Sequence, residues 1–400
     1  MHADTRRFLH FLRYPLPIAV GIRSSKSVEK TVGAKTLRTE TGPIKVKYSA
    51  NPQILLFLPP SMENIQPFKR LLDSPKDILI VTHFKPDADA LGSSLGLAGF
   101  LKKKGHRVTV VTPSDYPAFL AWMPGNEEVI ALSKESDEPE ERAKKAISKA
   151  EIIFCLDFSV LNRAEDLEES IRSSSAVKVL IDHHLEPEKF ADYEQWTTQS
   201  ASTAGLIFQL IVQLDEKHLI DADIATCLYA GLMTDTGGFR HSNTTQSEFM
   251  IASELVGLGA NPSLVAKLVY DTNTLERLKL TGFVLSQKLQ VLPEYNTAYI
   301  ALSSNDLKQF GSQTGDTEGL VNYGLSIAGV RLSVLLYERK EEIKFSFRSL
   351  GDFSVNEMAR KHFEGGGHKN ASGGMFKGSL DGALKKFLDL LPEYKSKLNS

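Results

Sequence analysis

The sequence predicts an α/β protein of two domains, and two observations support this prediction. Short apolar runs alternate with segments of helical length between residues 63 and 182, whereas strands return after a helical stretch, from residue 297 onward. The chain has 400 residues, of which 42% are hydrophobic and 24% are charged. This length fits two or three domains, and this composition excludes a wholly disordered chain.

The first 61 residues differ in charge from the rest of the chain. They carry ten Lys and Arg against three Asp and Glu, a balance of +7, while the remaining residues have a balance of −9. They also show no regular period of 2 or 3.6 residues. We interpret residues 1–61 as a disordered extension; a targeting segment and a basic arm for nucleic acid are the alternatives.

The larger domain, residues 62–290, begins with a predicted parallel sheet. Its four strands are short apolar runs bounded by polar residues, at 78–83, 107–111, 152–157 and 177–182. Helices that flank this sheet are expected at 63–73, 90–104 and 134–149. Strands that alternate with helices imply right-handed crossovers, and such open sheets bind ligands beyond the carboxyl ends of their strands.

The pattern changes in the second half of the chain. Residues 202–290 predict consecutive helices without a convincing strand, and residues 291–296 predict a linker. A smaller C-terminal α/β domain, residues 297–400, is predicted from three strands and two helices, at 297–302, 330–337, 342–348, 354–363 and 380–391.

The densest group of ionisable residues follows the first predicted strand. His83, Asp87 and Asp89 fall within seven residues, and Pro86 stiffens the turn between them. Alternate residues of an extended segment point to the same side, so Asp87 and Asp89 can reach two adjacent cations. Capping of the next helix by Asp89 is the alternative interpretation.

Three further segments place acids or histidines at the ends of predicted elements. Asp157 ends an apolar strand, where a buried carboxylate requires a cation or hydrogen-bond donors. The next strand ends in Asp182-His183-His184, and adjacent histidines are hard to explain as core residues. Asp235 lies at the end of a predicted helix, where the helix dipole disfavours a carboxylate and a cation would compensate.

The order of these motifs resembles the DHH phosphoesterase superfamily. The series from His83 through Asp157 and Asp182-His183-His184 to Asp235 follows the order of that superfamily. The sequence GGGH at 365–368, followed by ASGG at 371–374, resembles the glycine-rich signature of its DHHA1 domain. The two-domain layout is most similar to the stand-alone nanoRNase/pAp-phosphatase group, whose members degrade very short oligonucleotides or dephosphorylate 3′-phosphoadenosine 5′-phosphate.

The resemblance implies an active site in a cleft between the domains, with two divalent ions, Mn²⁺ in preference to Mg²⁺. One ion would be held by His83, Asp87 and Asp157; the other by Asp89, Asp157, His183 and Asp235. Carboxylate and imidazole ligands without a thiolate suit these metals, and two such ions can activate a bridging water. Asp182 is expected to orient an imidazole, and His184 to contact the substrate phosphate or the leaving oxygen.

The C-terminal domain is expected to supply the substrate contacts. Glycine lets backbone N–H groups approach a phosphate closely, and arginine can bind a phosphate through two hydrogen bonds. The candidate contacts are Gly366, Gly367, His368, Ser372, Arg348 and, from the first domain, Arg240. A helix that began after Gly373 would add its N-terminus to this site.

Parts of this pattern also occur in proteins with other functions. The same motif order serves inorganic pyrophosphatases and exopolyphosphatases. A non-catalytic nucleotide-binding sensor would have lost a metal ligand, yet every ligand position is filled. An exonuclease for long DNA would carry an added strand-binding domain, and no Gly-x-Gly-x-x-Gly follows the first strand, as a Rossmann dehydrogenase requires.

Composition restricts the partners. The net charge of −2 argues against binding of long duplex DNA, and no apolar run approaches the roughly 18 residues that cross a bilayer. Two cysteines, Cys155 and Cys227, favour a reduced, cytoplasmic setting over a disulfide framework. We therefore expect a short oligonucleotide or a mononucleotide bisphosphate as substrate; the oligomeric state stays open, and a homodimer is compatible with the sequence.

Overall fold

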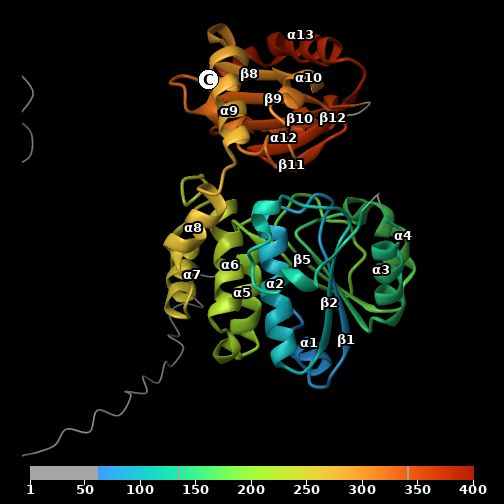
Figure 1. Cartoon of the computed structure of the whole chain (residues 1–400). Coiled ribbons are helices and arrows are strands. Elements are labelled where there is room, and N and C mark those ends of the chain that lie inside the picture. The colour runs from blue at the N-terminus through green and yellow to red at the C-terminus, as the bar shows by residue number, and fades with distance from the viewer. Residues whose placement is uncertain (1–61, 134–135, 340–341) are drawn as a thin grey trace, which may run out of the picture. The chain divides into compact units, whose positions relative to one another are not determined.

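The computed structural model describes residues 62–133, 136–339 and 342–400 of the chain (Figure 1). The interpretation of residues 1–61 as an extension lies outside the described residues. The described residues form two six-stranded sheets, each with its own set of helices. The prediction of an α/β fold with a parallel first sheet is confirmed.

The first sheet is parallel throughout, with the strand order β3-β2-β1-β4-β5-β6. The strands are β1 (Asp77–Val81), β2 (Arg107–Thr112), β3 (Ile130–Ala131), β4 (Ile152–Leu156), β5 (Val177–Asp182) and β6 (Tyr193–Trp196). Chain order reverses between β1 and β4, because β2 and β3 lie on one side of β1 and all later strands on the other. A reversal of this kind opens a crevice at the carboxyl ends of the strands, where ligands bind in open sheets.

Helices cover both faces of this sheet. Along β1, Ile78 and Ile80 belong to one hydrophobic cluster and Leu79 and Val81 to another, as alternation along a strand requires. One face packs against α2 (Ala88–Lys103), α5 (Thr203–Gln213) and α6 (Ala222–Asp235), together with α1 (Ile65–Leu71). The opposite face packs against α3 (Glu138–Lys149) and α4 (Glu168–Ser173) (Figure 1).

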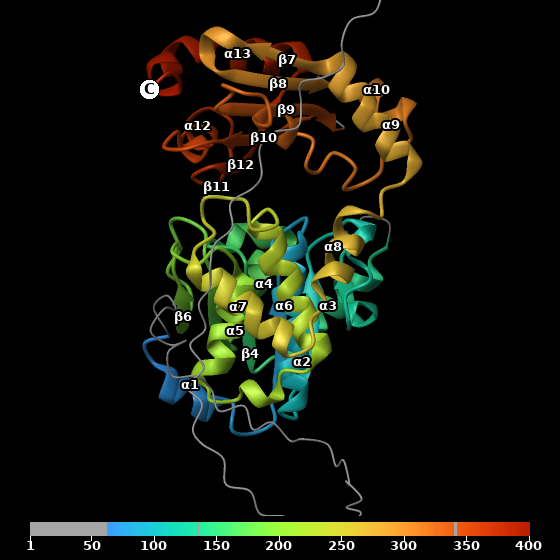
Figure 2. The same ribbon diagram turned by 90° about the vertical axis from the view of Figure 1, so that its left-hand side faces the viewer.

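Two more helices follow on the first of these faces. Figure 2 shows α7 (Gln246–Gly257) beside α5 and α6, and α8 (Pro262–Tyr270) comes next in the chain. No single described helix is both long and apolar enough to cross a membrane. Helices α7 and α8 reach that length and composition only as a pair, which is bent by 108°.

The second sheet is mixed, with the strand order β11-β12-β10-β9-β8-β7. Its strands are β7 (Leu289–Leu292), β8 (Thr297–Leu302), β9 (Leu332–Arg339), β10 (Glu342–Ser349), β11 (Gly366–His368) and β12 (Ala371–Lys377). Only β8 and β9 pair in parallel. Helices α12 (Val355–His362) and α13 (Leu380–Leu398) share a hydrophobic core with one face of this sheet. The short helices α10 (Ser304–Gln309) and α11 (Asn322–Leu325) lie between β8 and β9 in the chain.

Helix α9 (Leu275–Phe283) and strand β7 differ from the sequence-based expectation. Leu280 and Val284, at and just after α9, pack with Ile300 and Leu302 of β8 in the core of the second sheet. Strand β7 pairs with β8, although 202–290 was expected to contain no strand and 291–296 to be a linker. The four residues of β7 are half-buried or exposed, so they carry little hydrophobic pattern, and their pairing depends on β8.

Candidate metal centre

The centre is built at the carboxyl end of the first sheet, where β1, β4 and β5 end side by side. His83 follows β1, Asp157 follows β4, and Asp182 closes β5 ahead of His183 and His184. Helices α2, α5 and α6 contribute from one face of the sheet. The structure thus brings together residues that lie up to 152 positions apart in the chain.

The two imidazoles of His83 and His183 present the same nitrogen to the carboxylates. Their Nδ1 atoms lie 2.9 Å and 3.2 Å from the backbone carbonyls of Phe84 and Ser200. A carbonyl can only accept a hydrogen bond, so both Nδ1 atoms carry the proton and donate it. In the neutral ring this leaves a lone pair on Nε2, as in most metal-ligating histidines.

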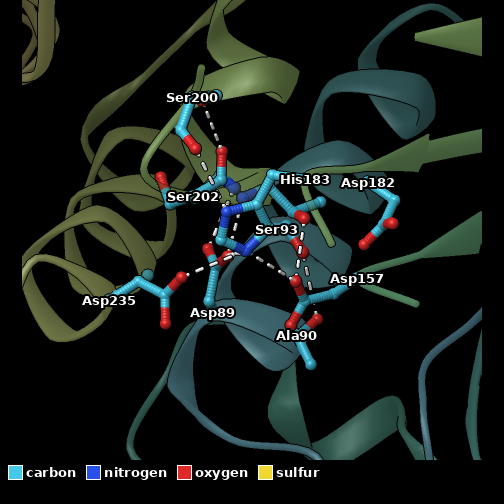
Figure 3. A network of polar contacts seen from close by, with 12 residues as sticks. Asp89, Ala90, Ser93, Asp157, Asp182, His183, Ser200, Ser202 and Asp235 are labelled. Carbon is cyan, nitrogen blue, oxygen red and sulfur yellow. Dashed lines mark hydrogen bonds and ion pairs between the residues drawn. The ribbon is translucent and has the colours of Figure 1, made fainter. Parts of the chain in front are cut away.

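These Nε2 atoms face carboxylate oxygens. His83 Nε2 lies 3.5 Å from Asp157, and His183 Nε2 lies 3.1 Å from Asp235, 3.4 Å from Asp157 and 3.8 Å from Asp89 (Figure 3). Buried His183 Nε2 has no hydrogen-bond partner among the described residues. Lone pairs that face lone pairs at these distances repel each other unless a cation lies between them.

Asp87 is the residue that caps α2. Its Oδ1 accepts hydrogen bonds from the backbone N–H groups of Asp89 and Ala90, at 2.9 Å and 3.1 Å. The alternative interpretation of Asp89 as the cap is therefore wrong, because Asp89 already lies in the first helical turn. Capping occupies Oδ1 and leaves the second oxygen of Asp87 available to a ligand.

Asp89 is held by the N-terminus of another helix. It is buried, and its two oxygens accept hydrogen bonds from the backbone N–H groups of Thr203 and Ala204, at 2.6 Å and 2.9 Å. The Thr203 hydroxyl also donates to Asp157, at 2.8 Å. Sequence reasoning missed Thr203, although Ser202 followed by an apolar run is a helix-start signal and Ser202 does cap α5.

Asp157 lies at the middle of the cluster and has an unusual backbone. Its φ of 66° lies in the left-handed region, which aspartate tolerates better than most residues and which occurs often at functional sites. Burial would raise the pKa of this carboxyl. The close imidazoles of His183 and His83, and the charge of His184, outweigh burial and hold the pKa well below its usual range.

The excess of carboxylates also shifts the pKa values of Asp89 and His183. Burial, followed by the charges of Asp157 and Asp235, raises the pKa of Asp89 well above its usual value. Burial would lower the pKa of His183, but Asp157 and Asp235 raise it well above its usual value instead. The cluster therefore favours any group or ion that brings positive charge.

The donor set fits two divalent ions. Ligand atoms of His83, Asp87 and Asp157 lie within 4.8 Å of one another, and so do those of Asp89, Asp157 and His183. Both sets include Asp157, as does a third group with Asp182 and His184. Asp235, which the motif resemblance adds to the second set, is not part of the group of Asp89, Asp157 and His183, although it lies 3.1 Å from His183 Nε2. Ligands held about 2.1 Å from one ion lie about 3 Å apart, which matches the spacing around His183 Nε2. Carboxylate and imidazole ligands without sulfur suit a divalent metal ion.

Asp182 and His184 form a separate pair beside the cluster. His184 Nδ1 lies 2.8 Å from Asp182 Oδ1, and the His184 backbone N–H donates to Asp182 Oδ2 at 3.1 Å. Asp182 is fully buried, and each of its two oxygens has a hydrogen-bonding partner in His184. The pair fixes the tautomer and the orientation of the His184 ring.

The glycine-rich segment forms a tight hairpin of β11 and β12. An added Cβ at Gly365 would lie 2.0 Å from the Gly373 carbonyl oxygen, and Gly367 has a φ of 140°, so glycine is required at both positions. The hairpin brings the His368 ring onto that of His184, with ring centroids 4.1 Å apart and planes 25° apart. The expectation of a helix after Gly373 is wrong, because β12 continues to Lys377.

The other expected substrate contacts lie at different places. Buried Ser372 donates its hydroxyl to the His368 carbonyl at 2.9 Å, so it stabilises the hairpin. Arg348 donates from a guanidinium nitrogen to the Phe347 carbonyl at 3.0 Å. Burial lowers the pKa of Arg348, while the charges of Asp235, Asp87 and Glu318 oppose this. Arg240 is exposed, and its Nε donates to the Gly237 carbonyl at 2.8 Å.

A large cavity lies beside these groups. Its volume is about 910 Å³. It is lined by residues from both domains, including His184 of the first domain and Gly366 and Gly367 of the second. Among the described residues, the other expected contacts do not line it. Residues that follow the strand ends of the first sheet and residues of the hairpin in the second sheet thus line the same cavity.

Comparisons with known proteins agree with this architecture. Residues 77–232 match the DHH family, N-terminal domain, and residues 295–397 match the DHHA1 domain. The bifunctional oligoribonuclease and PAP phosphatase NrnA of Thermus thermophilus is 31% identical over 319 residues, which cover 79% of this chain and 89% of that protein. The protein of the same name from Bacillus subtilis is 29% identical over 301 residues, covering 74% of this chain and 88% of the relative.

A solved structure is also similar. The crystal structure of an exopolyphosphatase-related protein from Bacteroides fragilis is 40% identical, with a TM-score of 0.79, and the match covers 84% of this chain and 97% of that one. The family matches, the relatives and this structure all extend over both sheets. The chain therefore belongs to the DHH–DHHA1 phosphoesterase superfamily.

Proposed function

We propose that this chain hydrolyses short oligoribonucleotides and dinucleotides, 3′-phosphoadenosine 5′-phosphate, or both. The observation that carries the proposal is the pair of ligand sets that share Asp157, next to a cavity with a glycine-rich wall. The relatives from Thermus thermophilus and Bacillus subtilis, both named oligoribonuclease and PAP phosphatase, support this substrate class.

Two divalent ions, Mn²⁺ in preference to Mg²⁺, would use the two ligand sets. His83, Asp87 and Asp157 would hold one ion; Asp89, Asp157, His183 and Asp235 would hold the other. When bound, such ions lower the pKa of a water and bind phosphoryl oxygens. Mn²⁺ is favoured because imidazole ligands suit it better than Mg²⁺, which prefers oxygen ligands and retains several waters.

The remaining residues of the site would position the substrate. His184, fixed by Asp182, would donate from Nε2 to the substrate phosphate or to the leaving oxygen. Backbone N–H groups at Gly366 and Gly367 would bind a phosphate from the cavity wall. His368, which stacks on His184, and Arg348 would contact the phosphate from outside that wall. Residues 62–290 would thus form the catalytic domain and residues 297–400 the substrate-binding domain, with α9 packed on the latter.

The cavity favours short substrates. Its volume of about 910 Å³ lies near the upper end of the range for small-molecule pockets, about 300–1,000 Å³. The balance of −9 over residues 62–400 would also repel a long polyanion outside the cavity. We therefore propose that single strands of about 20 nucleotides and long duplexes are poor substrates.

A product assay with Mn²⁺ tests this function. The substrates are the 5′-phosphorylated dinucleotide pApA, a cyclic dinucleotide, 3′-phosphoadenosine 5′-phosphate, RNA of two and five nucleotides, a strand of about 20 nucleotides, and pyrophosphate and tripolyphosphate. Highest turnover on the short nucleotides supports the proposal. Turnover confined to pyrophosphate or tripolyphosphate would contradict the proposal. It would favour a pyrophosphatase or exopolyphosphatase, an alternative that is tested because a similar solved structure is that of an exopolyphosphatase-related protein.

A further inference from the structure

The cavity is lined by five cationic side chains, of which three already have acidic partners. Lys85 pairs with Asp115, Arg360 pairs with Glu186, and Lys344 lies 2.9 Å from Glu342. The guanidinium groups of Arg163 and Arg339 form no hydrogen bond or ion pair with any described residue. These two cations are therefore available to an anion in the cavity.

Arg163 is the one whose backbone is hydrogen-bonded to the loop that follows β1. It lies in the 3₁₀ segment η4 (Leu161–Leu167), and its backbone N–H donates to the Val160 carbonyl at 3.1 Å. Its own carbonyl accepts a hydrogen bond of 2.7 Å from the Phe84 N–H. Phe84 directly follows His83, and its carbonyl accepts from the His83 ring, so Arg163 is hydrogen-bonded to the residue next to a proposed metal ligand.

Two acids beside this segment have partners other than Arg163. Glu188 accepts from the Leu161 N–H at 3.1 Å and from Arg172 at 2.7 Å. Glu186 is paired with Arg360. The segment is thus built to hold its backbone firmly while the half-buried guanidinium of Arg163 stays free.

Arg163 lines the same cavity as the glycine-rich hairpin. The cavity wall also includes His184 of the first domain and Gly365, Gly366 and Gly367 of the hairpin. A phosphate bound there would accept the two parallel hydrogen bonds that a guanidinium offers.

The two proposed substrates share one chemical feature. In pApA and in 3′-phosphoadenosine 5′-phosphate, a single nucleoside carries the scissile phosphate on its 3′ oxygen and a second phosphate on its 5′ oxygen. If the metal centre binds the 3′ phosphate, the 5′ phosphate needs its own cation about one nucleoside away. We propose that Arg163 binds this 5′-phosphate and so sets the preference for 5′-phosphorylated substrates, an inference that rests on the proposed function.

The test compares the enzyme with and without Arg163 on substrates with and without the phosphate. A contact between charged groups contributes about 1.5–3 kcal/mol, so the wild type should prefer pApA over ApA by about 10- to 150-fold in kcat/KM. Arg163→Ala should remove most of this preference and leave ApA turnover within about twofold. Arg163→Lys, which keeps the charge without the planar fork, should lie in between.

The matched control is Arg142→Ala. Arg142 is exposed on α3, has no partner in the described part of the chain and does not line the cavity. Its replacement by alanine makes the same change in net charge as Arg163→Ala, but outside the cavity that holds the proposed contact. It should leave both substrates unaffected. An equal loss with Arg142→Ala would show a general electrostatic effect and overturn the inference.

A second readout separates this inference from the proposed function. Hydrolysis of bis(p-nitrophenyl) phosphate reports the metal centre alone, and its inhibition by 5′-AMP relative to adenosine reports the 5′-phosphate contact. Hydrolysis of this ester without any turnover of nucleotides would refute the proposed function, while the inhibition constants would still test Arg163. Equal losses on pApA and ApA, or unchanged inhibition by 5′-AMP in Arg163→Ala, would overturn the inference.

Discussion

Gly231→Ala is the substitution that most directly tests how the metal centre is packed. Gly231 lies inside α6, where that helix crosses α2 and α5. A Cβ at this position would lie 2.6 Å from Asp89 Oδ1 and 2.7 Å from the Cβ of Ala204. Neither atom can give way easily, because Asp89 is held by two backbone N–H groups and Ala204 is part of α5.

The expected cost follows from these contacts. Overpacking typically lowers the free energy of unfolding by about 1–3 kcal/mol, whereas alanine stabilises a helix by about 1 kcal/mol relative to glycine. Displacement of Asp89 also weakens a hydrogen bond to a charged group, worth about 1.5–3 kcal/mol. We expect a net loss of about 2–4 kcal/mol in the free energy of unfolding, together with reduced metal content, because Asp89 belongs to one ligand set.

Urea denaturation, metal analysis and turnover measure the effect, and the chain offers a matched control. Gly282 is an exposed glycine of α9, and a Cβ there would meet no atom within 4 Å. Gly282→Ala should therefore gain about 0.5–1 kcal/mol and leave activity unchanged. If Gly231→Ala proved as stable and as active as the wild type, α2, α5 and α6 would be packed less tightly than the structure indicates.

Three further predictions concern single residues. Asp157→Asn should abolish turnover and lower the metal content, since Asp157 belongs to both ligand sets; wild-type rates at saturating Mn²⁺ would contradict this. His184→Ala should lower the rate by about 100-fold or more while metal content stays near normal, and loss of metal would mean that it is a ligand instead. Burial lowers the pKa of His106, and its Nδ1 accepts a hydrogen bond from the backbone N–H of Lys76. The neutral ring therefore stabilises the folded state at neutral pH, and this contribution should be lost as the pH falls below about 6.5. His106→Asn should flatten this pH dependence in urea denaturation, and an unchanged slope would exclude His106 as its source.

The fold could be predicted well where hydrophobic patterns are strong. Strands β1, β4 and β5 are buried along most of their length, so their apolar runs could be recognised without neighbours. Strand β3 has only two residues, at the edge of the sheet, and pairs with β2 through contacts that no local pattern encodes. The position of α9 likewise depends on which core receives Leu280, a choice made by tertiary packing.

The site could be predicted where its chemistry resides in side chains. Carboxylates and imidazoles at strand ends are visible in a sequence, and the structure brings His83, Asp157 and His183 together. The hydrogen bonds that hold Asp89 come from backbone N–H groups, which every residue other than proline possesses. Arg163 could not be predicted from the sequence for a related reason. It is distinguished by the absence of an acidic partner in the described structure, and contacts between side chains are not visible in a sequence.

The adjacent histidines show why their order along the chain matters. Successive residues after a strand point to different sides, so His183 and His184 approach the site from different directions. His183 donates from Nδ1 to a backbone carbonyl and turns Nε2 toward Asp235 and Asp157, the arrangement of a neutral ligand. His184 donates from Nδ1 to the buried carboxylate of Asp182 and stacks on His368 at the cavity. One pair of neighbouring residues therefore supplies one ring to the carboxylate cluster and one ring to the substrate cavity, and exchanging their roles would require the end of β5 to rotate by one residue.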